Sequence, residues 1–113
     1  MRYFRLEHNR RRLSWVVNAG RGPAERAVGL LWKRRLDAGC AFLLEPCRSV
    51  HTFGMRFPID VLFCDAQWRV VELLDGLAPW RIAGHKAACA VWELPTGSIR
   101  ALGLRLGDDL RPC

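Results

Sequence analysis

The sequence has no long hydrophobic run, no repeat and no low-complexity segment. No stretch approaches the roughly 18 consecutive apolar residues of a membrane-spanning helix. The N-terminus is basic, but the apolar stretch at residues 13–17 is too short for the core of a secretory signal, and no cleavage site follows it. These absences predict a cytoplasmic protein without a membrane span.

The chain also lacks any C-x-x-C pair, although it has five cysteines. An odd number without paired spacing is not the pattern of a disulfide framework, and cytoplasmic thiols stay reduced. Cys40, Cys47 and His51 are irregularly spaced and have no fourth ligand nearby, so we expect no metal site. We expect no cofactor, and we expect the cysteines to act as small, mostly buried apolar residues.

The basic residues form no continuous nucleic-acid motif, although the formal net charge is +7. They are nearly all arginine and are spread along the chain, with short clusters only at residues 10–12 and 33–35. No known DNA- or RNA-binding signature accompanies these clusters. Basic residues spread in this way are typical of a solvated surface, so nucleic-acid binding is the less favoured interpretation.

What the chain does have is enough apolar material for one core. Half of its 113 residues are hydrophobic and 26% are charged, which is an ordinary globular balance. Five tryptophans and five phenylalanines supply large side chains for burial. The length predicts a single domain over residues 1–113.

Turn signals recur roughly every 8–12 residues, which predicts many short strands. Residues 2–6 and 13–18 read as a first hairpin, and a helix is expected from Pro23 to just before Asp37. Further strands are expected at residues 41–45, 49–55, 59–64, 69–74 and 87–94, with one helical turn at 99–102 and a turn at Gly107-Asp108. This pattern predicts a mainly β fold, a sandwich or a barrel.

Several stretches carry a resemblance to a known family. They are RAVGLL at residues 26–31, GCAFLL at 39–44, RSVHTFGMRFPIDVLF at 48–63, VWELPTG at 91–97 and GLRLGD at 103–108. The central stretch is similar to the H-T-x-x-M-x-x-x-I-D type motif of the domain of unknown function 192 family. The resemblance covers roughly residues 26–110. It implies a mainly β fold, a jelly-roll-like sandwich or compact barrel with one flanking α-helix, and it implies no activity.

The central motif holds the candidate site. Alternation along a strand over residues 49–56 would place His51 on one face and Thr52 and Arg56 on the other. Gly54 has no side chain, so a ligand could approach its backbone closely. Asp60 is a carboxylate inside an apolar strand, which costs free energy unless the group is paired or hydrogen-bonded.

Two interpretations of these polar residues stay open. In the first, His51, Arg56, Asp60 and Glu93 converge on one pocket, where a histidine could do acid–base chemistry and an arginine could bind an anion. In the second, Asp60 and Glu93 bind backbone amides or arginines and stabilise the fold. For Asp60 the structural interpretation is favoured, because acidic residues beside X-Pro corners often serve turns.

We therefore expect a small β domain, a monomer or weak dimer, that binds an unknown small ligand or a protein partner through the His51–Asp60 region. Thr52, Gly54 and Arg56 are the ligand-binding candidates. The first alternative is a hydrolase or isomerase using His51 with Asp60 or Glu93; the second is an arginine-driven nucleic-acid binder. A partner-binding module predicts an exposed aromatic side chain such as Trp80 or Trp68, whereas an enzyme needs its polar groups within hydrogen-bond reach.

Overall fold

The computed structural model describes residues 2–20, 39–53 and 55–113. The helix expected between Pro23 and Asp37, and the candidate Gly54, lie outside these residues. In chain order the elements are β1 (Arg2–His8), β2 (Arg11–Gly20), β3 (Cys40–Leu44), β4 (Ser49–His51), β5 (Ile59–Cys64), β6 (Val70–Leu77), β7 (Ile82–Gly84), β8 (Ala90–Pro95), α2 (Ser98–Leu102) and β9 (Leu110–Pro112). The prediction of a mainly β fold is confirmed.

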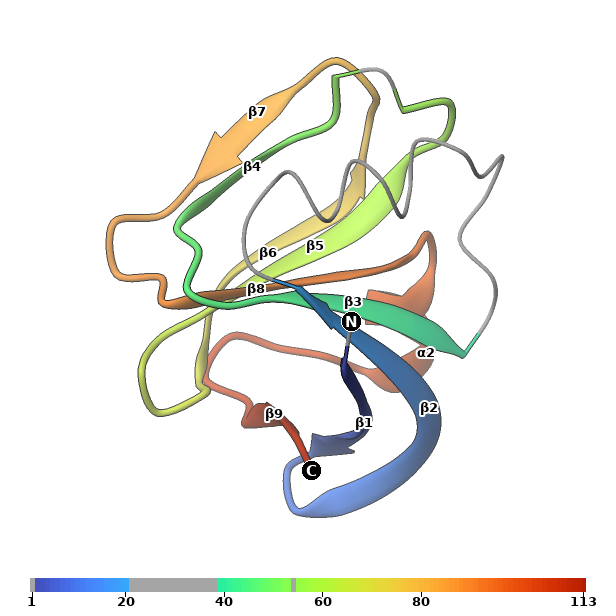
Figure 1. The fold of residues 1–113 in the computed structure, drawn as a ribbon, viewed down its shortest axis with the longest axis vertical. Helices are drawn as coiled ribbons and strands as arrows, with labels where there is room; N and C mark the ends of the chain where they lie inside the picture. The colour runs from blue at the N-terminus through green and yellow to red at the C-terminus, as the bar shows by residue number, and fades with distance from the viewer. Residues whose placement is uncertain (1, 21–38, 54) are drawn as a thin grey trace.

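Seven strands form one curled sheet in the order β6-β5-β8-β3-β2-β1-β9 (Figure 1). Only β2 and β3 are parallel; the other neighbours are antiparallel. Residues next to the two outermost strands meet in one isolated bridge, between Arg69 and Asp109. A closed barrel would need β6 and β9 to pair along their length. Among the described residues this is the only β-bridge between the two ends of the sheet, so the sheet is not a closed barrel.

The central strands β5 and β8 are buried on both faces. All six residues of β5 are buried, and alternate side chains enter different clusters. Leu62 of β5 and its partner Trp92 of β8 belong to the cluster that also holds Leu110. Val61 lies in the second cluster, which extends under β4 and β7. A strand that is apolar on both sides requires cover on both sides.

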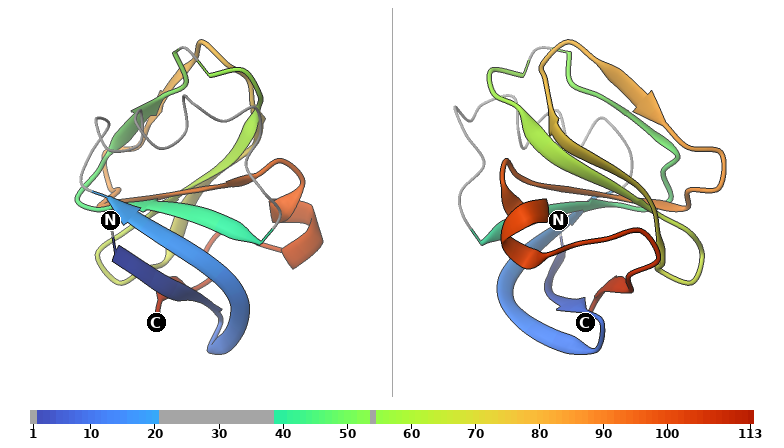
Figure 2. Two further views of the ribbon diagram at one scale, coloured as in Figure 1. Left: turned by 45° about the vertical axis from the view of Figure 1, so that its right-hand side comes forward. Right: turned by 180° about the vertical axis from the view of Figure 1, so that it is seen from behind.

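The two-stranded sheet of β4 and β7 supplies cover on the side of the second cluster. Val50 of β4 and Ala83 of β7 are partners in this small sheet, and both pack into that cluster. The small sheet and α2 lie on opposite sides of the molecule, as both views in Figure 2 show. No helix among the described residues combines the length and the apolar character needed to cross a bilayer.

The strand predicted at residues 49–55 is too long, and β7 was not predicted at all. Strand β4 ends at His51, and the backbone then turns, because the carbonyl of Thr52 accepts a hydrogen bond from the N–H of Met55 (3.2 Å). Simple alternation therefore fails beyond His51: Phe53 is 43% exposed whereas Met55 is buried. Three residues, as in β7, are too few to give a periodic pattern.

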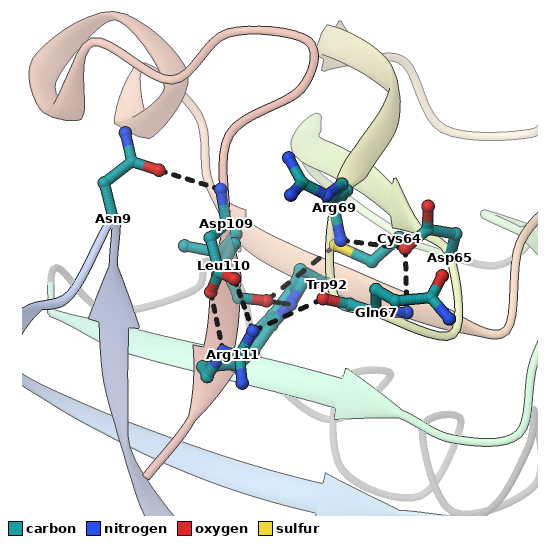
Figure 3. A network of polar contacts seen from close by, with 9 residues as sticks. All are labelled: Asn9, Cys64, Asp65, Gln67, Arg69, Trp92, Asp109, Leu110 and Arg111. Atoms are coloured by element: carbon teal, nitrogen blue, oxygen red, sulfur yellow. Dashed lines mark hydrogen bonds and ion pairs between the residues drawn. The ribbon is translucent and has the colours of Figure 1, made fainter.

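A polar network fixes the last strand, β9, against the core (Figure 3). The indole N–H of the buried Trp92 donates to the carbonyl of Leu110 (3.1 Å), and the Asp109 N–H donates to Oδ1 of Asn9 (2.8 Å). Arg111 donates from Nε to Oδ1 of Asp109 (2.7 Å). Together these bonds join the end of the chain to β8 and to the turn after β1.

This network predicts a loss of stability in acid. The hydrogen bonds from Arg111, and then its positive charge, hold the pKa of Asp109 below its ordinary value, although partial burial opposes them. A carboxyl group with a lowered folded-state pKa stabilises the protein above its unfolded-state pKa, and this contribution disappears as pH falls through the folded-state pKa. The free energy of unfolding of the wild type should therefore fall more steeply than that of Asp109→Asn between about pH 5 and pH 2. Denaturant unfolding across this range measures both slopes, and equal slopes would contradict the prediction.

Candidate functional site

A row of three rings, two of them exposed, lies where β4 ends and β7 begins. The ring centroids of His51 and Phe53 are 5.2 Å apart, and those of Phe53 and Trp80 are 5.9 Å apart, with planes inclined by 27°. Trp80 is 64% exposed, and Ile82, the strand partner of His51, is 70% exposed. We call His51, Phe53, Trp80 and Ile82 the aromatic strip. Neighbouring apolar groups this exposed are typical of a binding surface.

The backbone of Trp80 is held in an unusual conformation. Its φ of +63° lies in the left-handed region, which side chains larger than glycine rarely adopt. Thr52 accounts for this geometry: its carbonyl accepts the N–H of Trp80 (3.0 Å), and its N–H donates to the carbonyl of Arg81 (2.9 Å). Backbone outliers that the surrounding structure maintains are concentrated at functional sites.

The side chain of Thr52 is fully buried and serves the same segment. Its hydroxyl donates to the carbonyl of Ala78 (2.7 Å) and accepts a hydrogen bond from the N–H of Arg81 (2.8 Å). The hydroxyl thus uses its proton and one acceptor position within the protein. Thr52 was a candidate ligand-binding residue; here it positions Trp80 and faces away from solvent.

His51 lies half-buried at the inner end of the aromatic strip. Its Nδ1 atom is buried and has no hydrogen-bond partner among the residues that the structure describes. The ring of Phe53 lies beside the imidazole, with the two planes inclined by 35°. No carboxylate holds this histidine in the described part of the chain, as acid–base catalysis would usually require.

Asp60 is a buried carboxylate that joins three parts of the fold. Its side chain projects from β5, where Oδ1 accepts the N–H of Gly76 in β6 and Oδ2 accepts the N–H of Ile99 in α2, both at 2.8 Å. Each oxygen thus has a backbone donor, which compensates the cost of burying the charge. This is the structural role that was favoured for Asp60 from the sequence.

Asp60 and Glu93 point to opposite faces of the large sheet. Asp60 is paired with Leu94, and Glu93 with Val61, so the two carboxylates belong to different rows of side chains. Leu94 lies in the first cluster and Val61 in the second. One pocket on one face of the sheet therefore cannot contain both carboxylates.

His51 and Asp60 are also separated. Val50, the residue before His51 in β4, packs into the second cluster. Asp60 faces the first cluster, on the other side of the large sheet. Arg56 is exposed. The described residues hold no group of three His, Cys, Asp or Glu side chains able to bind a metal ion. This arrangement gives no support to acid–base chemistry by His51 with Asp60.

Comparison with known proteins gives the family. The model of the DUF192 family, described as an uncharacterized ACR, matches residues 5–112. The chain belongs to the DUF192 family. A UPF0127 protein of Pyrococcus horikoshii is 35% identical over 105 residues, covering 88% of this chain and 90% of that protein. A UPF0127 protein of Pyrococcus abyssi is 40% identical over 63 residues, which is 55% of this chain and 53% of that protein.

Solved structures show the same fold. A crystal structure of a protein from Sinorhizobium meliloti has a TM-score of 0.84 at 20% identity and covers 98% of this chain and 94% of its own. A protein of unknown function from Novosphingobium aromaticivorans has a TM-score of 0.77 at 20% identity, covering 96% and 83%. At this identity the likeness establishes only the DUF192 fold.

The sequence prediction placed the site in the motif at residues 51–60 and did not include the residues of β7 that lie beside that motif in the fold. Trp80 and Ile82 come from a segment read as a connection, yet they provide the most exposed part of the aromatic strip. One signal was available in the sequence: residues 46–59 and 76–92 contain no acidic residue. Both segments contribute to the small sheet of β4 and β7.

The role of Asp60 in this DUF192 fold predicts a large effect of Asp60→Asn. The amide offers one oxygen instead of two, so its NH₂ group would face the N–H of Gly76 or Ile99. We expect the free energy of unfolding to fall by about 2–4 kcal/mol, the scale for disrupting buried, charge-assisted hydrogen bonds. The same substitution at the surface, Asp75→Asn, should cost less than about 0.5 kcal/mol. Urea denaturation measures both, and equal effects would exclude the role assigned to Asp60.

Cys64 should be less reactive in the native state than the exposed thiols of Cys89 and Cys113. Burial, reinforced by the negative charges of Asp65 and Asp109, raises its pKa to about 12. The reactive thiolate is therefore scarce at pH 8. Peptide mapping after brief iodoacetamide treatment should show alkylation of the exposed Cys89 and Cys113, and of Cys64 only after unfolding. Native alkylation of Cys64 at the rate of Cys89 would contradict this.

Proposed function

We propose that this protein is a binding module and that the aromatic strip is its binding site. The observation that carries the proposal is Trp80: its side chain is 64% exposed on a left-handed backbone. A large exposed aromatic side chain on an unfavourable backbone contributes nothing evident to the core. Tryptophan is also enriched among residues that dominate binding energies.

The polar candidates take different parts in this proposal. His51 belongs to the aromatic strip, and Thr52 is a positioning residue because its bonds fix the segment of Trp80. Arg56, which is exposed, remains a candidate contact for an anionic group. Asp60 has its oxygens occupied by backbone N–H groups, so we assign it to the fold.

We also propose a cytoplasmic location and a monomer or weak dimer. Four cysteines are free thiols: Cys64 is buried, Cys40 is half-buried, and Cys89 and Cys113 are exposed. Free thiols are typical of a reducing compartment. Equilibrium sedimentation of the reduced protein, and fractionation of cells that express it, would test the two statements.

A hydrolase or isomerase using His51 has less support than binding. That chemistry needs a general base within about 2.6–3.2 Å of its partner groups. Asp60 bonds to Gly76 and Ile99 instead, and faces the other cluster. Binding of a ligand by Trp80 requires no general base.

The test is a thermal-shift screen with defined probes: a nucleotide set, an oligosaccharide set and short peptides of varied charge. We expect at least one probe to raise the melting temperature of the wild type but not that of Trp80→Ala. Leu106→Ala is the matched control, because Leu106 is also 64% exposed but lies outside the strip. The control should respond as the wild type does.

Either of two results would refute the proposal. In the first, every stabilising probe acts equally on the wild type and on Trp80→Ala. In the second, no probe stabilises the wild type at all. Unchanged circular dichroism of Trp80→Ala would show that a lost response does not come from misfolding.

A further inference from the structure

We infer that Cys47 and Cys89 form a thiol–disulfide exchange site, which closes to a disulfide by reaction with a small-molecule disulfide of the glutathione type and reopens with the corresponding thiol. The observation that carries this inference is a backbone hydrogen bond between the two residues. The site is separate from the aromatic strip and does not depend on the binding function proposed for that strip.

Cys47 and Cys89 lie in neighbouring connections of the fold. Cys47 follows β3 and leads into β4, whereas Cys89 lies between β7 and β8, and the two connections run side by side at the left of Figure 1. The N–H of Cys47 donates to the carbonyl of Cys89 (3.1 Å). Bond lengths along this path limit the distance between the two Cα atoms to about 7 Å at most. Disulfides usually span Cα separations of about 4.4–6.8 Å, so this spacing fits a disulfide.

The two side chains differ in accessibility, and this difference sets the order of their reactions. Cys89 is exposed, so a small disulfide can reach its sulfur from solvent and no packing fixes its rotamer. Cys47 is half-buried beside the second cluster, and its Sγ donates to the carbonyl of Ser49 (3.0 Å). Cys89 is therefore the thiol that reacts first, and Cys47 is the thiol that completes the disulfide.

The reaction consists of two exchange steps. The thiolate of Cys89 attacks one sulfur of the small disulfide, so that a new S–S bond forms and the other half leaves as a thiolate. Cys47 then gives its proton to solvent, and its sulfur attacks the sulfur of Cys89 and releases the second half. The two cysteines lose two protons and two electrons, and the small disulfide is reduced to two thiols. Excess thiol reverses both steps.

Cys64 is a third cysteine at the same place, but its side chain is excluded from the exchange. Its carbonyl accepts the N–H of Cys89 (2.8 Å), so these two backbones are also in contact. The Cys64 side chain is fully buried in the first cluster, whereas Cys47 packs against the second, on the other side of the large sheet. Burial raises the pKa of the Cys64 thiol to about 12, so its reactive thiolate is scarce.

The disulfide would restrain the small sheet at the end opposite the aromatic strip. Ser49 of β4 pairs there with Gly84 of β7, and the carbonyl of Arg48 accepts the N–H of His85 (3.0 Å). The new bond would join the connection that enters β4 to the connection that leaves β7. A cross-link reduces the number of conformations open to the segment that it closes. We therefore expect slower amide hydrogen exchange in β4 and β7 of the oxidised protein.

The fold explains why the spacing of the cysteines did not indicate this pair. Cys47 and Cys89 are separated along the chain by β4, β5, β6 and β7, and they meet only where the small sheet joins the large one. A pair that opens and closes also differs from a structural disulfide framework. Disulfides of reducing compartments are usually transient, and a reversible pair agrees with the proposed cytoplasmic location.

Peptide mapping without reduction, after incubation of the reduced native protein with glutathione disulfide, tests the inference. Trypsin cuts after Arg48 and Lys86 and releases Cys89 in the peptide 87–100, which contains no other cysteine. We expect this peptide to be linked to the peptide 36–48, with the loss of two hydrogen atoms from the pair. Dithiothreitol should separate the two peptides again.

Variants assign the sulfur atoms, because the peptide 36–48 contains both Cys40 and Cys47. Cys40→Ser should leave the link intact. Cys47→Ser should abolish the link and leave glutathione attached to Cys89. Cys113 is the matched control thiol, because it is also exposed but lies at the C-terminus beside β1. It should retain glutathione in the wild type, where Cys89 does not.

Four results would overturn the inference. They are a native protein whose mass does not change, a wild-type Cys89 that keeps its glutathione, a link from Cys89 to any cysteine other than Cys47, and a link between two chains. Hydrogen exchange measured by mass spectrometry tests the restraint of the small sheet. Equal exchange of β4 and β7 in the reduced and oxidised proteins would overturn that part of the inference.

Discussion

The burial of β5 on both faces is the constraint on which the rest of the structure depends. A strand without a solvent face needs an apolar layer on each side, and the chain supplies these layers from different segments. Leu110 and α2 contribute to one side, and the small sheet of β4 and β7 covers the other. The single carboxylate of β5, that of Asp60, is tolerated because two backbone N–H groups from β6 and α2 bind it. The same bonds fix those elements to the central strand.

The aromatic strip results from the way in which the small sheet of β4 and β7 covers the core. Because β4 and β7 must bury Val50 and Ala83 against the core, the alternate residues His51 and Ile82 face outward. Thr52 then joins the residues after β4 to the segment before β7, and its bonds support the left-handed backbone at Trp80. The inner face of the small sheet completes the core, and its outer face carries the aromatic strip.

Sequence reasoning succeeded where local pattern decides the structure. The first hairpin, the fully buried strand at residues 59–64 and the short helix after Gly97 were all predicted, because alternation, apolar runs and turn residues act over short distances. It failed at β7, whose three residues pair with β4 across about 30 positions of sequence. The opposite orientation of Asp60 and Glu93 depends on the register of β5 against β8, and the sequence does not specify that register. The candidate site changed accordingly, from a polar pocket to an aromatic surface.

The positions of the charged groups are the reason that we propose binding in place of catalysis. In the catalytic interpretation His51 acts with a carboxylate, and residues 46–59 and 76–92, which build the small sheet, contain none. Asp60 and Glu93 lie within the central strands and are fully buried, and the hydrogen bonds of Asp60 join β5 to β6 and α2. The groups exposed around the small sheet are the rings of Phe53 and Trp80 and basic side chains such as Arg81. These groups fit a binding surface, which is the function proposed for the aromatic strip.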